Sequence, residues 1–257
     1  MGCCQGCELF VNLLDSMGAR GSFFYEASGV LGALDMLWGK YHRMNKNNSP
    51  YSAAITGCAM LYYEFGRILP TLLSEDREQL LKDEIENNQV LQINSRKARR
   101  TFVLEFKRRF ASVPIHFWQS WQEWSEEGQR AGLFYAILKT YRLVFDFHFN
   151  VAVRRWNSVD CHLDKSDIMM EFNEISAHDE FVDSWSENTK SRCASHYLTI
   201  LRQTGLLTEK TNELQSIHPS SSELEYYIRS GEEWFLEACL LYPYEINNIK
   251  LELICRE

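Results

Sequence analysis

The chain has 257 residues, of which 45% are apolar and 24% charged, and its formal net charge is −8. This composition is that of an ordinary soluble protein with one large or two small domains, and it excludes disordered, fibrous and disulfide-stapled proteins. The eight cysteines are scattered and mostly lie singly in apolar runs, which indicates a reducing, cytoplasmic compartment.

Residues 1–43 differ from the rest of the sequence. They hold three of the eight cysteines and show no clean helical period before Gly29. The polar stretch that begins at Met44 resembles the start of a chain. We therefore predict that Met44 is a natural first residue and that residues 1–43 are a translated upstream extension. The alternative is a genuine helical arm at residues 30–41.

From Tyr51 the apolar spacing becomes helical. Four residues share one stripe: Ile55, Leu61, Phe65 and Leu69. Pro70 is expected to end or kink this helix because it lacks a backbone N–H donor. A second, acidic amphipathic segment is predicted over residues 72–90.

Residues 96–109 carry seven positive charges and one negative charge, so this segment is +6 in a protein whose remainder is −14. It is predicted to be a helix that Ser95 caps and that turns one aromatic side inward: Phe102, Val103, Phe106 and Phe110. Five cations lie on the opposite side: Arg96, Lys97, Arg100, Lys107 and Arg108. Arg99 and Arg109 fall near the apolar side, and we expect them to be structural.

The five outward cations are candidate contacts to a phosphate backbone. Clustered Lys and Arg displace the counterions that condense on nucleic acid, and such a patch is unusual on an acidic protein. The alternative is a solvated helix face that forms ion pairs with acidic neighbours.

Pro114 is expected to open the next helix, in which Trp118, Trp121 and Trp124 recur at every third position. Such a stripe can stack nucleobases, but it more often belongs to the core, and we favour the core. A long helix is predicted over residues 129–156. Its apolar part contains Lys139, Arg142 and Asp146. Inserting these charged side chains into a bilayer costs free energy, so we predict a buried helix of a folded domain and not a membrane span.

The character of the sequence changes after Asn157, where we place a domain boundary. Asp164 is expected to cap a helix that contains Ile168, Phe172 and Ile175. Ser184 and Glu187 fit a capping box for the following helix, over residues 187–203, and Gly205 is expected to end it. Residues 206–209 and 213–217 can then pair as a small hairpin. This order of elements is typical of a winged helix-turn-helix.

The helix over residues 187–203 is the most clearly divided in the chain. Its apolar side holds Cys193, Ala194, Tyr197, Leu198, Ile200 and Leu201. Its polar side offers groups that donate and accept hydrogen bonds, as readers of the major groove do: Asn188, Arg192, Ser195 and Thr199. No carboxylate occurs on that side after Glu187. The alternative is an exposed polar face in a domain that binds protein.

Motifs for catalysis and metal binding are weak or missing. The sequence contains no phosphate-binding glycine loop, no nucleophile elbow and no H-E-x-x-H pattern. Cys4 and Cys7 have the spacing of half a zinc site, but no second pair follows at ligand spacing. We therefore expect no enzymatic activity, no cofactor, no metal site and no small-molecule substrate.

Several short sequence motifs resemble those of the BrxA family. They are Tyr51-Ser-Ala-Ala-Ile-Thr-Gly, Glu64-Phe65, Ile68-Leu69-Pro70, Asn88-Gln-Val-Leu-Gln, Arg108-Arg109-Phe110, Leu138-Lys-Thr-Tyr-Arg-Leu-Val-Phe-Asp-Phe, Trp185-Ser-Glu-Asn-Thr-Lys and Leu201-Arg-Gln-Thr-Gly-Leu-Leu. The motifs are diffuse, but they stand in the right order and spacing over residues 49–250.

BrxA is a small accessory component of BREX, a bacterial system that excludes bacteriophage and methylates host DNA. The resemblance implies a helical N-terminal part similar to the NusB antitermination fold, a winged-helix part, and nucleic-acid binding without catalysis. Together with the patterns above, it predicts a mainly α protein with a doubtful extension (1–43), a NusB-like helical domain (44–158) and a winged-helix domain with a small hairpin (159–257).

The predicted function is that of a cytoplasmic, non-enzymatic protein that binds double-stranded DNA in such a system. The nine residues named on the two polar helix faces would make the contacts. Two alternatives stay open, namely an adaptor that docks on other BREX subunits and an RNA-binding protein that uses the NusB-like part.

Overall fold

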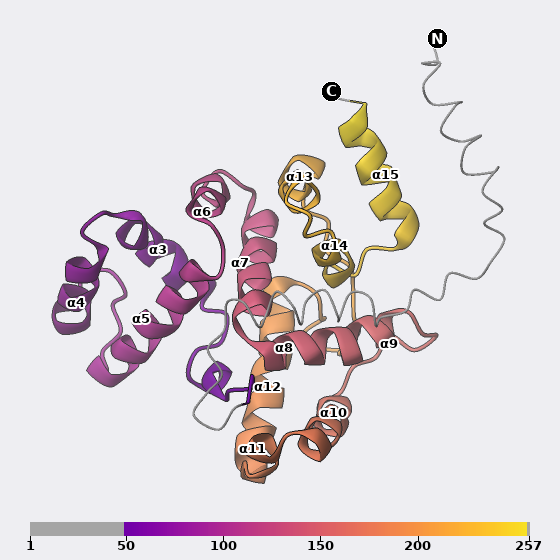
Figure 1. The fold of residues 1–257 in the computed structure, drawn as a ribbon, viewed down its shortest axis with the longest axis horizontal. Coiled ribbons are helices and arrows are strands. Elements are labelled where there is room, and N and C mark those ends of the chain that lie inside the picture. Colours follow the sequence, from indigo (N-terminus) through magenta and orange to yellow (C-terminus); the bar gives the residue numbers. More distant parts are fainter. Residues whose placement is uncertain (1–48, 256–257) are drawn as a thin grey trace. The chain divides into compact units, whose positions relative to one another are not determined.

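The protein was analysed as a computed structural model that describes residues 49–255, all of which belong to one compact unit. The predicted extension, the alternative helical arm, Met44 and the cysteines at positions 3, 4 and 7 lie outside these residues. The described part is mainly helical, which confirms the predicted fold class at that level (Figure 1). None of the helices within residues 49–255 combines the length and the hydropathy that a membrane span requires.

The first part of the unit contains one short 3₁₀ turn and four helices: η1 (Ala54–Gly57), α3 (Tyr62–Leu73), α4 (Arg77–Asn87), α5 (Arg96–Ala111) and α6 (Ile115–Trp121). The single stripe predicted from Ile55 is wrong, because Leu61 adopts a left-handed conformation with φ 50° and α3 begins only after it. Pro70 does not end α3, which continues for three residues to Leu73.

The middle of the chain contains α7 (Glu126–Thr140), α8 (Arg142–Phe147), the π-helix η2 (His148–Val153) and α9 (Arg154–Trp156). The predicted single helix over residues 129–156 is therefore broken at Tyr141, whose backbone is extended. A buried network ties Tyr141 to α5 at the break. The Tyr141 hydroxyl donates to Glu105 at 2.7 Å and accepts from Arg109 at 3.2 Å.

The next part contains α10 (Lys165–His178), α11 (Glu180–Asp183) and α12 (Glu187–Thr204). Asp164 caps α10 as predicted, and Ile168, Phe172 and Ile175 are buried. Gly205 ends α12 with φ 94°. The predicted cap of α12 is wrong by two residues, because Ser186 is the N-cap and the Ser184 hydroxyl donates to the Phe181 carbonyl at the end of α11.

The predicted hairpin forms only isolated bridges. Leu207 pairs with Leu214, the Thr208 N–H donates to the Glu213 carbonyl at 3.0 Å, and a second bridge joins Glu213 to His162. The segment around His162 thus lies beside the returning arm of the hairpin. Among the described residues no pairing is long enough to count as a strand.

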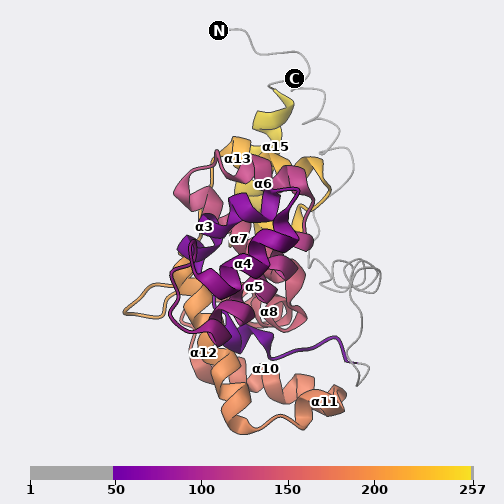
Figure 2. The ribbon, with the colours of Figure 1, turned by 90° about the vertical axis from the view of Figure 1, so that its left-hand side faces the viewer.

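The chain closes with α13 (Ser221–Arg229), α14 (Trp234–Ala238) and α15 (Pro243–Ile254). The residue patterns predict two closing helical pieces, over residues 223–227 and 232–241, which correspond to α13 and α14, whereas α15 was not predicted. Both ribbon views place α13 and α15 at the opposite end of the unit from α10 and α11 (Figures 1 and 2). α12 packs against α7, so the boundary predicted after Asn157 lies inside this compact unit and stays a prediction.

Candidate nucleic-acid interface

The basic helix α5 is divided as its sequence predicts. The Ser95 hydroxyl accepts a hydrogen bond from the Ala98 N–H at 3.3 Å and so caps the helix. Val103 and Phe106 are buried, and Phe102 and Phe110 are half-buried on the same side. The cations Arg96, Lys97, Arg100 and Arg108 are exposed, and Lys107 is half-buried.

The two inward arginines of α5 are structural, as predicted. Arg109 is fully buried and donates to the carbonyls of Cys58, Ala59 and Met60 at 2.7 to 2.8 Å. Arg99 donates to the carbonyls of Ile85 and Ile93, which lie at the end of α4 and in the loop before α5. Buried carbonyl groups need such donors, so these side chains hold the backbone around α5 and are not available to a ligand.

Three of the five outward cations form ion pairs. Arg96 pairs with Glu86, Lys107 pairs with Glu78 at 2.7 Å and Arg108 pairs with Glu105 at 2.7 Å. The hydrogen bond from Lys107 lowers the pKa of Glu78, and the hydrogen bond from Arg96 lowers the pKa of Glu86. The expected strip of five open cations is therefore reduced to Lys97 and Arg100, which form no ion pair within residues 49–255.

The acidic partners come mainly from α4, which packs against α5. Sequence reasoning identified an acidic segment beside a basic one but did not pair them. Arg96 and Lys107 form their ion pairs at the exposed surface, where solvent screens the attraction, so a polyanion can compete for both cations. Arg108, in contrast, pairs with the buried Glu105. The contact of these cations with nucleic acid stays a prediction.

The polar side of α12 is more open. The apolar side is buried as predicted, at Cys193, Ala194, Tyr197, Leu198, Ile200 and Leu201. On the other side Asn188, Arg192 and Ser195 are exposed and Thr199 is half-buried. In the described part of the chain, neither Asn188 nor Arg192 forms a hydrogen bond or an ion pair. Both side chains are therefore available to a ligand.

The two hydroxyl groups on this face are already in use as donors. Ser195 donates to the Ser191 carbonyl and Thr199 donates to the Ser195 carbonyl, each at 3.0 Å. Their oxygens can still accept a hydrogen bond, for instance from the amino group of a base. A contact to phosphate, which only accepts, requires the hydroxyl to rotate away from the helix.

Two further groups complete the surface. Lys165, on α10, donates to the Ser191 hydroxyl at 2.7 Å and so brings a cation next to α12. The sequence reading missed this residue because α10 and α12 come together only in the fold. His196 is half-buried; burial and the nearby charge of Arg192 both lower its pKa. The ring is therefore neutral at neutral pH.

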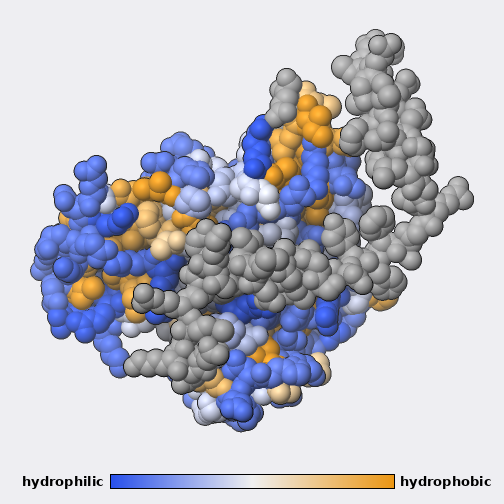
Figure 3. Space-filling model, viewed as in Figure 1, coloured by the Kyte–Doolittle hydropathy of each residue, from blue (hydrophilic) through white to orange (hydrophobic). Residues whose placement is uncertain are grey.

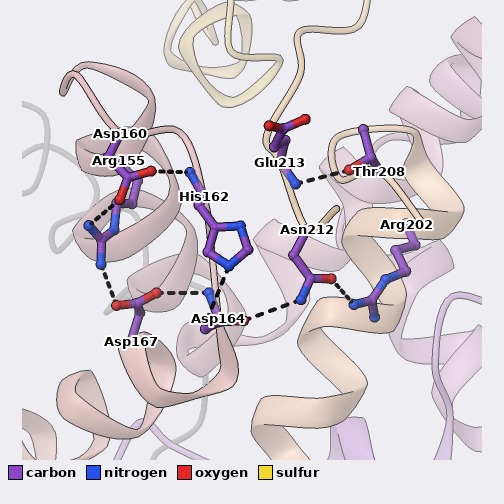
Figure 4. A network of polar contacts seen from close by, with 9 residues as sticks. All are labelled: Arg155, Asp160, His162, Asp164, Asp167, Arg202, Thr208, Asn212 and Glu213. Carbon is purple, nitrogen blue, oxygen red and sulfur yellow. Dashed lines mark hydrogen bonds and ion pairs between the residues drawn. The ribbon is translucent and has the colours of Figure 1, made fainter. Parts of the chain in front are cut away.

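A polar network fixes the hairpin against α12 (Figure 4). Asn212 donates to Asp164 at 3.2 Å and accepts from Arg202 at 2.6 Å. Arg155 bridges Asp160 and Asp167. Arg202 belongs to the polar side of α12, but this network occupies it. The face available to a ligand thus ends before the last turn of the helix.

Helix α6, which carries Trp118 and Trp121, belongs to the core, as predicted. Trp118 and Trp121 are buried, and their indole N–H groups donate to the carbonyls of Phe110 and Gln129. Neither ring is available to stack on a base. Within residues 49–255, no group of three or more His, Cys, Asp or Glu side chains could hold a metal ion.

Comparisons with known proteins concern most of the described chain. A family model described as BrxA matches residues 49–231. A protein from Bacillus cereus (strain H3081.97), described as BREX protein BrxA, is 21% identical over 169 residues, which are 66% of this chain and 84% of that protein. The crystal structure of an uncharacterized protein from Magnetospirillum magneticum is similar with a TM-score of 0.62 and 24% identity, over 74% of this chain and 98% of that one. This last likeness shows the fold alone.

Proposed function

Because the chain belongs to the BrxA family, we propose that it is an accessory protein of a BREX-type phage-defence system that binds double-stranded DNA and has no enzymatic activity of its own. The B. cereus protein that it matches is named as a BREX protein, and the proposal extends that role to this chain. The site of action that we propose is cytoplasmic.

The observation that carries DNA binding is the outer face of α12. Asn188 and Arg192 are exposed there without intramolecular partners, and Ser195 keeps its acceptor positions. Asn pairs with the edge of adenine, and Arg pairs with guanine or phosphate. No carboxylate follows Glu187 on this face, so no negative charge there opposes the DNA backbone.

The order of elements supports the same proposal. A winged helix-turn-helix has the same order of elements as α10, α12 and the hairpin of residues 206–215. In that fold the second helix enters the major groove. We propose that the C-terminal part is of this type and that the preceding helices are NusB-like. On α5, phosphates would be held by Lys97 and Arg100, and also by Arg96, Lys107 and Arg108 when the ion pairs of these three open. Such contacts add affinity without sequence information.

The test is a fluorescence-anisotropy titration of the full chain with duplex DNA, single-stranded DNA and RNA across a salt series. Arg192→Ala should weaken duplex binding and lower the slope of log K against log[salt] by about one unit. Arg67→Ala is the matched control, because Arg67 is a surface arginine on α3 that pairs with Glu64. An Arg192→Ala variant that binds as the parent does would contradict the proposed face.

A second candidate function is an adaptor for other BREX subunits. The ion pairs on α5 favour it, because a face that already binds carboxylates can exchange them for those of an acidic protein surface. Co-purification with partner subunits after nuclease treatment, without binding to free duplex, would select the adaptor. Preference for RNA over duplex at equal salt would select the third reading, an RNA-binding NusB-like protein.

A further inference from the structure

The outer face of the last described helix, α15, is apolar and uncovered by residues 49–255. Tyr244, Leu251 and Ile254 are 62%, 49% and 64% exposed. At 100° per residue these three side chains lie within about 80° of one another around the helix. Figure 3 shows hydrophobic residues, in orange, at the upper end of the molecule, where Figure 1 places α15. Exposed apolar residues that gather on one face, unlike scattered ones, mark an interaction surface.

A stack of aromatic rings supports this face. The Trp156 ring stacks on Tyr242 with centroids 5.0 Å apart, and Tyr242 stacks on Tyr244 at 5.8 Å with an interplanar angle of 12°. Tyr244 is thus already held in place by its neighbours. A fixed aromatic side chain loses little entropy when a partner covers it, and tyrosine is enriched among the residues that dominate binding energy.

The surroundings of α15 are acidic. Residues 218–255 contain seven glutamates and two cations, Arg229 and Lys250. Both cations form ion pairs, with Glu225 and Glu233 respectively. Glu252, on the exposed side of α15, accepts a hydrogen bond from the Ser221 hydroxyl at 2.6 Å and has no cation beside it among the described residues. Of the other glutamates, Glu232 pairs with Lys139 and Glu223 is buried, so the negative charge next to the apolar face comes mainly from Glu245 and Glu252 of α15 itself.

The negative charge on α15 indicates which kind of partner can bind the apolar face. A second copy of the chain would bring two acidic borders together, and nucleic acid or an anionic membrane would be repelled in the same way. A protein segment with cations beside its apolar residues is complementary on both counts.

We propose that the outer face of α15 is a docking surface for a basic amphipathic helix of a partner protein. Tyr244, Leu251 and Ile254 would contact the apolar stripe of that helix, and the glutamates would face its Lys and Arg side chains. All of α15 lies beyond the residues that the family model matches, so the family match does not account for this surface.

The experiment uses the full chain and a fluorescein-labelled synthetic peptide of about five helical turns, built from Leu and Lys with the leucines on one stripe. Its counterpart carries Glu in place of Lys. The Leu/Lys peptide should bind in an anisotropy titration at physiological salt, and the Leu/Glu peptide should not. Leu251→Ser should weaken binding by roughly tenfold or more, the effect of removing an anchor.

The matched control is Leu104→Ser, because Leu104 on α5 is exposed to the same extent, 49%, as Leu251. It should leave peptide binding unchanged. Glu252→Lys is a second test in case Leu251→Ser does not fold. It changes a surface charge, leaves the apolar side chains in place and should also weaken binding of the Leu/Lys peptide.

Three results would overturn the proposal. The first is equal binding of the Leu/Lys peptide by the parent, Leu251→Ser and Glu252→Lys proteins. The second is a dimer in sedimentation velocity that Leu251→Ser abolishes, which would identify a second copy as the occupant. The third is binding to vesicles of phosphatidylcholine and phosphatidylglycerol that the same variant abolishes.

Discussion

Asn212 and Arg202 are joined by a hydrogen bond of 2.6 Å that links the hairpin to the last turns of α12. The amide nitrogen of Asn212 also donates to Asp164, the N-cap of α10, at 3.2 Å. One loop residue therefore holds both helices of the proposed DNA-binding part. Its backbone is left-handed, with φ 53°, a conformation that asparagine tolerates better than most residues.

Asn212→Ala should lower the free energy of unfolding by about 1–2 kcal/mol, because it removes both hydrogen bonds and strains the left-handed backbone. Asn212→Gly loses the same bonds without the strain and should cost less. Urea unfolding followed by circular dichroism measures both. If the two variants match the parent, the link does not stabilise the fold.

The adjacent arginines Arg108 and Arg109 of α5 should differ strongly in how much the same substitution costs. Arg109→Leu leaves the carbonyls of Cys58, Ala59 and Met60 without their donor, so the free energy of unfolding should fall by about 3 kcal/mol or more. Arg108 is exposed but its partner Glu105 is buried; Arg108→Leu leaves Glu105 with the Tyr141 hydroxyl as a donor and should therefore cost less than Arg109→Leu. Denaturant midpoints of the two variants check this, and similar losses would mean that Arg109 is not the structural group.

A pH dependence should arise from His148. This ring is fully buried, donates to the Ala238 carbonyl at 2.9 Å and accepts from the Tyr197 hydroxyl at 3.0 Å. Burial lowers its pKa to about 4, so the folded state favours the neutral ring. The neutral ring therefore contributes its full share to the free energy of unfolding above the ordinary pKa of 6.5. That contribution, about 3 kcal/mol in total, is lost as the pH falls toward 4.

His148→Gln is the variant that isolates this effect. It should be less stable than the parent at pH 7, and its stability should vary less between pH 6.5 and pH 4. Urea unfolding across that range gives both curves. Parallel curves would show that the proton does not bind to His148 on unfolding.

The ion pair between Lys107 and Glu78 should limit the response of DNA binding to salt. Glu78→Gln releases Lys107 and should make the slope of log K against log[salt] steeper, by up to about one unit. Arg100→Ala should make it shallower by a similar amount, because Arg100 has no ion pair to break. Duplex titrations from low to high salt measure both slopes. Unchanged slopes in both variants would remove α5 from the interface.

Much of the helical architecture follows from local signals. The apolar side of α12, the caps at Ser95 and Asp164 and the end at Gly205 were all predicted correctly, because each depends on residues a few positions apart. The buried roles of Arg99 and Arg109 also followed from their place on the helix. The BrxA resemblance, read from short motifs, is confirmed by the family match.

Several failures concern contacts between distant residues. Tyr141, at which the predicted long helix is broken, is bonded to Glu105 and Arg109, more than thirty positions away. The neutralised cations of α5 depend on α4, and Lys165 reaches α12 only through the fold. Helix α15 was not predicted because Asn247 and Lys250 interrupt its apolar positions, although Glu245, Asn248 and Glu252 share one side of it.

The π-helix at His148–Val153 has a consequence for a surface far along the chain. A π turn accommodates an additional residue compared with an α turn, and the helical course continues on both sides of it. Trp156 lies three residues beyond this turn and stacks on Tyr242, which in turn stacks on Tyr244. The winding at residues 148–153 therefore sets where the base of that ring stack stands, about ninety positions before Tyr244 in the chain.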